Sequence, residues 1–156
     1  MKNQKEFELQ CAIAEYLRTA HKGVMFLSDT RASLRLTFPQ QVRAKKIQAD
    51  GFACPDLMIF AVRGTYAGMF LELKAESPYR KDGLLRVDAH LARQMDAIEH
   101  LRGEGYHADF YWEFETAQTA IDRYLASQRE LFRDDGEDAL RTDLSMIHSA
   151  ERQQRR

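Results

Sequence analysis

Residues 55–74 read PDLMIFAVRGTYAGMFLELK, and this stretch determines the fold that we expect for the chain. Leu57–Val62 is an apolar run typical of a buried strand, and Gly68–Lys74 predicts the next strand. A turn around Arg63–Gly64 separates the two runs. Because the connection is short, we expect the strands to pair as an antiparallel hairpin.

The residues before this hairpin predict a helix and a strand. Residues 5–21 predict an amphipathic helix that ends before Gly23, and Val24–Leu27 predicts a short strand. For residues 29–50 we expect a strand around Arg35–Phe38, followed by a basic loop or a short helix. The apolar face of the first helix consists of Leu9, Ile13, Tyr16, Leu17 and Ala20.

The residues after the hairpin continue the alternation of helix and strand. Residues 75–87 predict a polar loop, and Asp88 is a plausible N-cap for a helix that runs to about Arg102, before Gly103 and Gly105. Ala108–Trp112 predicts a strand and Thr116–Leu131 a final helix. This order predicts an α/β fold, a mixed β-sheet flanked by helices.

Length and composition bound the class of protein. The chain has 156 residues, of which 44% are hydrophobic, and we expect one folded domain over residues 1–132 with a charged helix or tail over 133–156. No stretch approaches the roughly 20 apolar residues of a membrane span, and the N-terminal residues lack the apolar run of a signal peptide. Cys11 and Cys54 form no metal-binding cluster, so we expect free thiols in a reducing, cytoplasmic compartment.

The charge distribution is more informative than the net charge of −1, which alone argues against nucleic-acid binding. Residues 30–49 hold several cations and no acid, whereas residues 104–143 hold eleven acids and four arginines. The basic stretch is either a phosphate-binding surface or a solvated loop, and charge alone does not decide between them. Its cations are Arg31, Arg35, Arg43, Lys45 and Lys46.

Two carboxylates and a lysine stand at corresponding ends of the predicted hairpin. Asp56 opens one strand, and Glu72 and Lys74 close the next on one face, because side chains alternate along a strand. Two carboxylates that meet there form an oxygen-rich site suited to Mg²⁺ or Mn²⁺. The lysine would stabilise negative charge that builds on a phosphate. The alternative is a surface Glu–Lys pair and an unrelated Asp at a strand start.

The order of these motifs resembles the PD-(D/E)xK nuclease superfamily and its restriction-endonuclease-like core, and more narrowly the VRR-NUC domain. The matching elements span residues 6–113, about two thirds of the chain. In order, they are EFELQ at residues 6–10, GFACPDL at 51–57, GMFLELK at 68–74, Gln94 on the next helix, and the helix end from Leu101 to Gly105.

The resemblance implies a Mg²⁺- or Mn²⁺-dependent endonuclease that cuts branched or structured DNA, often as a homodimer, and a phage or bacterial origin. It implies that Asp56, Glu72 and the Leu73 carbonyl hold the metal and that Lys74 is catalytic. It adds Glu6 as a further acid and Gln94 as a polar contact. We expect DNA phosphates to contact Arg31, Arg43, Lys45 and Lys46, and also Tyr79, Arg80, Lys81 and Arg86 in the loop after Lys74.

The first helix offers three glutamates for the extra acid. A helix turns about 100° per residue, so with Leu9 at zero Glu6 falls at about 60°, inside the apolar stripe, and Gln10 at about 100°, on its edge. Glu8 and Glu15 fall at about 260° and 240°, on the solvated face. An inward carboxylate is costly unless a cation or a donor meets it, which favours a metal or its bound water as the partner of Glu6. The alternative is that Glu6 frays into water in the first turn.

Other notable residues have plainer interpretations. His90, His100 and His107 lack metal-like spacing and are interpreted as structural or surface residues, Trp112 as a core residue, and Cys54 as a small buried hydrophobe. Two functions compete with a DNA endonuclease. One is a DNA-binding or assembly protein with a degenerate nuclease fold, and it ranks lower because every carboxylate and the lysine are present. The other is a metal-dependent phosphodiesterase that acts on RNA or nucleotides.

Overall fold

A four-stranded sheet lies at the centre of the part of the chain that the computed structural model describes, residues 2–28, 37–47, 49 and 52–128. Its strands stand in the order of the sequence: β1 (Phe26–Ser28), β2 (Leu57–Ile59), β3 (Met69–Leu73) and β4 (His107–Tyr111). β1 and β2 pair antiparallel, as do β2 and β3, whereas β3 and β4 pair parallel. The predicted mixed sheet is therefore confirmed.

The β2–β3 hairpin has the predicted antiparallel pairing. Leu57 stands opposite Leu71 and Ile59 opposite Met69. Gly68 precedes β3 at a point where the backbone of the two hairpin segments approaches closely. A Cβ at this position would lie 3.1 Å from the Ile59 carbonyl oxygen. The strands are shorter than expected, because β2 ends at Ile59 and the hairpin continues to its turn without regular pairing.

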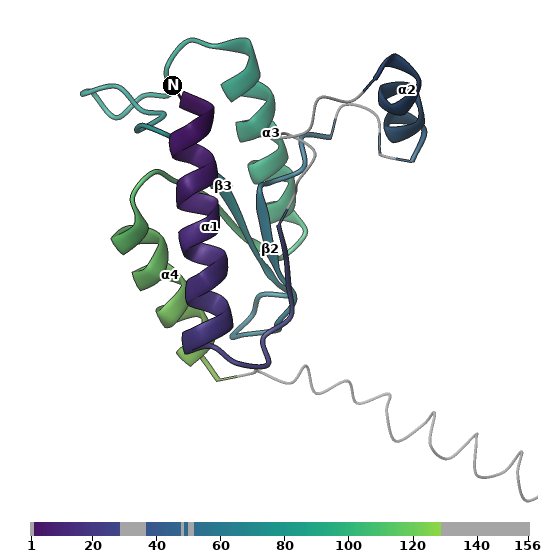
Figure 1. Ribbon diagram of the computed structural model, residues 1–156. Coiled ribbons are helices and arrows are strands. Elements are labelled where there is room, and N and C mark those ends of the chain that lie inside the picture. The colour runs from purple at the N-terminus through teal and green to yellow at the C-terminus, as the bar shows by residue number, and fades with distance from the viewer. Residues whose placement is uncertain (1, 29–36, 48, 50–51, 129–156) are drawn as a thin grey trace, which may run out of the picture.

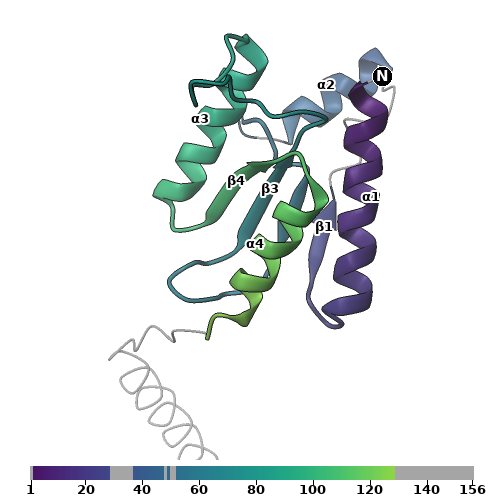
Figure 2. The same cartoon turned by 90° about the vertical axis from the view of Figure 1, so that its left-hand side faces the viewer.

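Helices cover both faces of the sheet (Figures 1 and 2). α1 (Lys2–Ala20) and α4 (Phe114–Ala126) lie side by side on one face, and α3 (Ala89–Gly103) covers β4 on the other. α3 also connects β3 to β4, as a crossover between parallel strands requires.

Two apolar clusters hold these layers together. The larger joins α1, α4 and one face of the sheet, and the smaller joins α3 and the other face. Trp112 packs against the smaller cluster, which confirms its interpretation as a core residue. The fully buried members of the larger cluster, all at most 1% exposed, are Ile13, Leu17, Leu57, Ile59, Met69, Leu71, Leu73, Ala117 and Ile121.

Some of the predicted helix ends agree with the structure and others do not. Asp88 caps α3 as predicted, and its carboxylate accepts hydrogen bonds from the His90 and Leu91 N–H groups. α1 begins at Lys2, three residues before the expected start, and Ala20 is exposed rather than part of the packed face. α4 begins at Phe114 and ends at Ala126, so the expected helix to residue 131 is too long.

The strand predicted around Arg35–Phe38 is wrong where the structure describes it, because Phe38 begins the helix α2 (Phe38–Lys46). The cause is one of the two bonds of a capping box: the Gln40 side chain accepts a hydrogen bond of 2.8 Å from the Thr37 N–H. The Thr37 carbonyl then accepts the first helical hydrogen bond, from the Gln41 N–H. Pro39 suits this first turn, where its missing N–H costs nothing. The short helix that the sequence left open is therefore confirmed.

Among the described residues, none of the helices has the length and apolar character needed to cross a membrane. Cys11 is exposed, Cys54 is half-buried, and both are free thiols. Residues 133–156, for which we expect a charged helix or tail, lie outside the described residues, as do Arg31 and Arg35.

Candidate functional site

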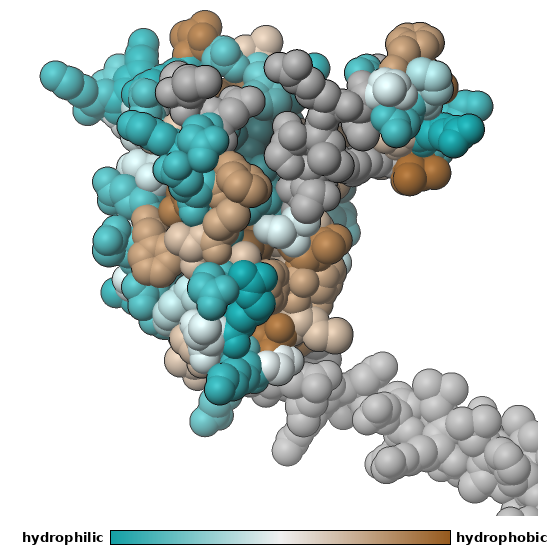
Figure 3. Space-filling model, viewed as in Figure 1, coloured by the Kyte–Doolittle hydropathy of each residue, from teal (hydrophilic) through white to brown (hydrophobic). Residues whose placement is uncertain are grey.

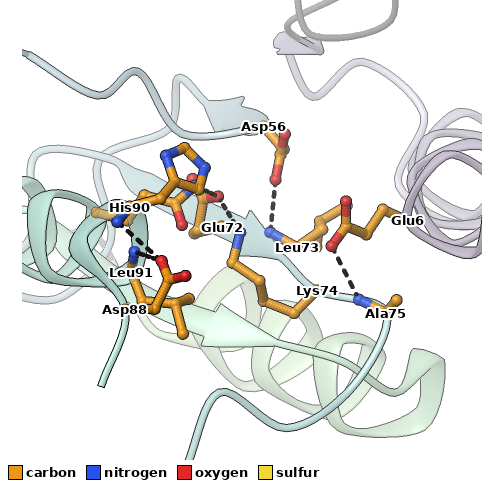
Figure 4. A network of polar contacts seen from close by, with 10 residues as sticks. Glu6, Asp56, Glu72, Leu73, Lys74, Ala75, Asp88, His90 and Leu91 are labelled. Atoms are coloured by element: carbon orange, nitrogen blue, oxygen red, sulfur yellow. Dashed lines mark hydrogen bonds and ion pairs between the residues drawn. The ribbon is translucent and has the colours of Figure 1, made fainter. Parts of the chain in front are cut away.

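The predicted carboxylates and lysine meet at the end of β3 that leads into the 75–87 loop (Figure 4). Asp56 comes from the residues just before β2, Glu72 and Lys74 from the end of β3, and Gln94 from α3. Antiparallel pairing of β2 with β3 brings the start of one strand beside the end of the other. The hairpin register therefore explains the meeting of residues that lie 16 to 18 positions apart in the sequence.

Main-chain and side-chain contacts fix Asp56 in place. One of its carboxylate oxygens accepts a hydrogen bond of 2.7 Å from the Leu73 N–H. Its own carbonyl accepts a hydrogen bond of 3.0 Å from the Gln10 side chain of α1. Gln10 was not among the predicted site residues, although its position on the edge of the apolar stripe of α1 was a signal for an inward polar contact.

Glu72 is the most buried charged residue of the site, with 3% of its surface exposed. Burial, together with the nearby Asp56 carboxylate, raises the pKa of Glu72 to about 8, and Lys74 offsets part of this rise. The Glu72 carboxylate accepts hydrogen bonds from the Lys74 ammonium, at 2.7 Å, and from the Gln94 amide. Two carboxylates held this close repel each other unless a cation compensates them.

Lys74 has a fixed position beside Glu72. Its side chain is 13% exposed, and its ammonium lies 5.8 Å from the centre of the Phe110 ring, within the range of a cation–π contact. Held between a carboxylate and an aromatic face, the ammonium supplies a positive charge at a defined point of the site.

Glu6 is the one glutamate of α1 that turns toward the site, as the helical arithmetic predicts. Its carboxylate is half-buried and accepts a hydrogen bond of 3.2 Å from the Ala75 N–H (Figure 4). Glu8 and Glu15 are exposed and pair within α1, with Gln4 and Arg18. Because α1 begins at Lys2, Glu6 lies beyond its first turn, and the fraying alternative is wrong. The donor that meets Glu6 here is a main-chain N–H.

The donor set fits a hard divalent cation. Asp56 and Glu72 present carboxylates to each other, and the Gln94 side-chain oxygen is buried without a hydrogen-bond partner among the described residues. In the described part of the chain no group of three or more His, Cys, Asp or Glu side chains is placed to hold a metal ion. A metal here would need a main-chain oxygen or water as further ligands, which hard cations such as Mg²⁺ accept readily.

The cations predicted to contact DNA fall into two groups. Arg43 and Lys46 are exposed on α2, which stands apart from the sheet and against which no described helix or strand packs extensively (Figure 1). The surface around α2 is both basic and apolar, since Phe38 at its start and Ile47 just after its end are 78% and 83% exposed (Figure 3). The side chain of Lys45 lies outside the described part of the structure.

The loop residues after Lys74 are engaged with one another. Arg80 pairs with Asp82 at 2.7 Å and Arg86 with Glu76 at 3.3 Å, and both pairs are exposed. Lys81 is exposed, whereas the ring of Tyr79 packs edge-on against the aromatic residues Phe110 and Trp112. Because the ring is packed, the phosphate contact predicted for Tyr79 would have to come from its hydroxyl group.

A pocket of about 450 Å³ opens beside Lys74 and Glu6. It lies between the start of α1, the 75–87 loop and the first turn of α3. His90, interpreted from the sequence as structural or surface, is exposed and lines this pocket one helical turn before Gln94. The signal available in the sequence was this spacing of four, which places both side chains on one face of a helix.

Comparison with known proteins supports this arrangement at the level of fold. A solved structure of a VRR_NUC domain protein superposes with a TM-score of 0.50 and is 21% identical, over 78% of this chain and 88% of that one. The chain has the fold of that protein. The resemblance to VRR_NUC domains that the ordered motifs predict is thus confirmed in three dimensions. No protein-family model and no curated protein sequence matches the chain.

Proposed function

We propose that the chain is a metal-dependent nuclease that hydrolyses phosphodiester bonds of DNA, with branched or structured DNA as its substrate. The observation that carries the proposal is the buried Glu72 carboxylate, held against Asp56 on one side and Lys74 on the other. A protein that needed only stability would gain little from this arrangement, because the desolvation of a buried ion pair offsets much of its attraction. The VRR_NUC fold supports the same function.

Asp56, Glu72 and the Leu73 carbonyl would hold Mg²⁺ or Mn²⁺ in this proposal. When bound, the metal would activate water and stabilise negative charge on the phosphate and the leaving oxygen. Like charges that destabilise the metal-free site would then become ligands, which explains why the fold holds them together.

The other residues of the site would stabilise charge on the substrate phosphate or orient the carboxylates that hold the metal. Lys74 places its ammonium where charge builds on the phosphate in the transition state. Gln94 donates to Glu72 and fixes the orientation of that carboxylate, and the Leu73 N–H does the same for Asp56. Glu6 ties α1 to the loop that follows Lys74 and would add a further acid near the metal.

A cleavage assay with supercoiled plasmid, a linear duplex, a four-way junction and single-stranded RNA tests the proposal. Each substrate is incubated with Mg²⁺, Mn²⁺ or EDTA. We expect both metals to support cutting of DNA, the junction to be cut faster than linear duplex, and EDTA to stop the reaction. Cleavage of RNA alone would favour a ribonuclease, and binding of DNA without any cleavage would favour an assembly protein with a nuclease fold.

A homodimer is the second part of the proposal, and it rests on the resemblance to VRR-NUC domains. Sedimentation equilibrium of the full chain, with and without a four-way junction, measures the mass directly. A monomer under both conditions would contradict it.

A further inference from the structure

The hydrolysis described above uses only Lys74 and Glu6 at one edge of the neighbouring pocket. Its walls come from the start of α1, the loop after β3 and the first turn of α3, and its volume of about 450 Å³ falls within the range of small-ligand sites. Because Lys74 and Glu6 belong both to this pocket and to the candidate site, any group bound in the pocket would lie next to the reacting phosphate.

The charge of the pocket argues against a second phosphate. Glu6, Glu76 and Asp88 line it together with Lys74 and Arg86. Both cations already pair with glutamates, Lys74 with Glu72 at 2.7 Å and Arg86 with Glu76 at 3.3 Å. The start of α3 is engaged as well, since Asp88 accepts the hydrogen bonds of its first N–H groups. A phosphate group would therefore gain little electrostatic attraction in this pocket, although the adjacent candidate site suits a phosphate.

The uncharged lining suits a flat, partly apolar group. Pro78 is fully buried below, Leu91 is half-buried, and Val87 is 97% exposed at the rim. His90 adds an exposed aromatic ring, of the kind on which unstacked bases rest in proteins that bind single strands. The carboxylates of the pocket accept hydrogen bonds, as the amino groups of bases require.

We propose that this pocket binds one unpaired base of the DNA, adjacent to the phosphate that is cut, with His90 as a stacking surface. The inference rests on the proposed nuclease function and refines its substrate: the nucleotide beside the cut must leave the duplex stack. Branch points, bulges and frayed ends supply such a nucleotide at a low cost of unpairing, whereas an intact duplex does not.

The test measures base exposure and affinity without requiring catalysis. A junction strand carries the fluorescent base 2-aminopurine at successive positions around the branch, and the full chain is titrated in, once with EDTA and once with Ca²⁺. The variants are His90→Ala, His90→Phe and, as a matched control on the same helix, His100→Ala, an exposed residue outside the pocket. A second series of junction strands carries an abasic site at each of the same positions, so that affinity can be compared with and without the base.

We expect one position to change its fluorescence strongly on binding. There His90→Ala should weaken affinity about tenfold, His90→Phe should retain it, and His100→Ala should match the wild type, given the usual strength of base–aromatic stacking. With the abasic strand the wild type and His90→Ala should bind equally.

Two results would overturn the inference: no position responds, or His90→Ala weakens binding as much on abasic as on normal DNA. A fluorescence response without any Mg²⁺-dependent cleavage would support base binding in the pocket and contradict the proposed nuclease activity. Cleavage of a fully paired duplex at the same rate as the junction would contradict base binding in the pocket and support the proposed nuclease activity.

Discussion

The carboxylate site at the end of β3 and the basic helix α2 differ in how the fold supports them. Glu72 is 3% exposed and contacts side chains from β3 and α3, and Asp56 is tied to β3 and α1. α2 projects from the body of the molecule with its cations and apolar side chains exposed (Figures 1 and 3).

This difference matches the two kinds of chemistry that the proposed function requires. Transition-state stabilisation requires groups held in a fixed geometry, which packing and hydrogen bonds provide. Attraction between cations and DNA phosphates tolerates movement, because it depends on charge density more than on position. Substitutions in the first region should therefore change the rate of cleavage, and those in α2 should change affinity and its salt dependence.

The largest effect is expected from Asp56→Asn. Asparagine keeps the volume and an oxygen that can accept the Leu73 N–H, but it removes the charge that a metal requires. We expect Mg²⁺-dependent cleavage to fall by at least about 10³-fold, the upper range for the loss of one electrostatic group. Single-turnover cleavage of the four-way junction measures it, and robust cutting by this variant would show that Asp56 is no ligand.

The same variant should gain stability without metal. Burial and Asp56 raise the folded-state pKa of Glu72 to about 8, so the folded protein binds more protons than the unfolded one between pH 4.5 and about 8. Stability from this group therefore falls as pH rises through that window. Removing the Asp56 charge lessens the fall, and the gain in Tm over wild type in EDTA should be greater at pH 8 than at pH 5.

Lys74→Ala is expected to have the next largest effect, on rate rather than on affinity. The ammonium contacts Glu72 and the Phe110 ring at the centre of the site, where the proposed function would build negative charge on the phosphate. The single-turnover rate at saturation should fall by about 10²–10³-fold, with DNA affinity within about threefold of wild type. Loss of binding with an unchanged rate would make Lys74 a simple phosphate contact.

The glutamates of α1 give a matched series with a smaller effect. Glu6→Gln should reduce cleavage by about 10- to 100-fold, as the loss of a group that supports metal ligands commonly does. Glu8→Gln and Glu15→Gln, on the exposed face, should retain wild-type activity. Partial rescue of Glu6→Gln by higher Mg²⁺ would place its effect in metal affinity. Equal activity of all three variants would show that Glu6 has no role in cleavage and that α1 contributes only packing.

The parts of the fold that follow local rules could be predicted from the sequence. The β2–β3 hairpin rests on two apolar runs with a short turn, and the Asp88 cap follows from side-chain chemistry at a helix start. The inward position of Glu6 follows from the 100° step of a helix. These rules together placed Asp56, Glu72 and Lys74 at one end of the hairpin, and the structure confirms that they meet.

What could not be predicted depends on tertiary contacts. The hydrogen bond from Gln10 to the Asp56 carbonyl joins residues 46 positions apart, so the edge position of Gln10 on α1 signals an inward contact but does not identify its partner. The pocket that His90 lines exists only because the 75–87 loop folds back between α1 and α3. The strand predicted around Arg35–Phe38, in contrast, was an avoidable error, since Thr37 followed three residues later by Gln40 is a recognisable signal for a helix start.

The smallest effect on cleavage is expected from the triple variant Arg43→Ala, Lys45→Ala, Lys46→Ala. These cations belong to a helix that no other described helix or strand packs against extensively, so their loss should leave the fold and the chemical step intact. Binding should weaken on every DNA sequence alike, because phosphate contacts carry no base information.

The salt dependence of binding separates this effect from a change in the site. Each phosphate contact on duplex DNA contributes about 0.9 to the slope of log affinity against log salt, so the slope should become shallower by up to that amount per cation removed. Lys22→Ala with Arg123→Ala serves as the control, since both cations are exposed and lie in segments at the far end of α1 and α4 from α2 (Figure 1). An unaltered slope in the triple variant, or an equal change in the control, would place the DNA on another surface and leave α2 free for a protein contact through Phe38 and Ile47. A shallower slope in the triple variant alone, with an unchanged single-turnover rate at saturating DNA, would establish that α2 contributes affinity while the end of β3 contributes chemistry.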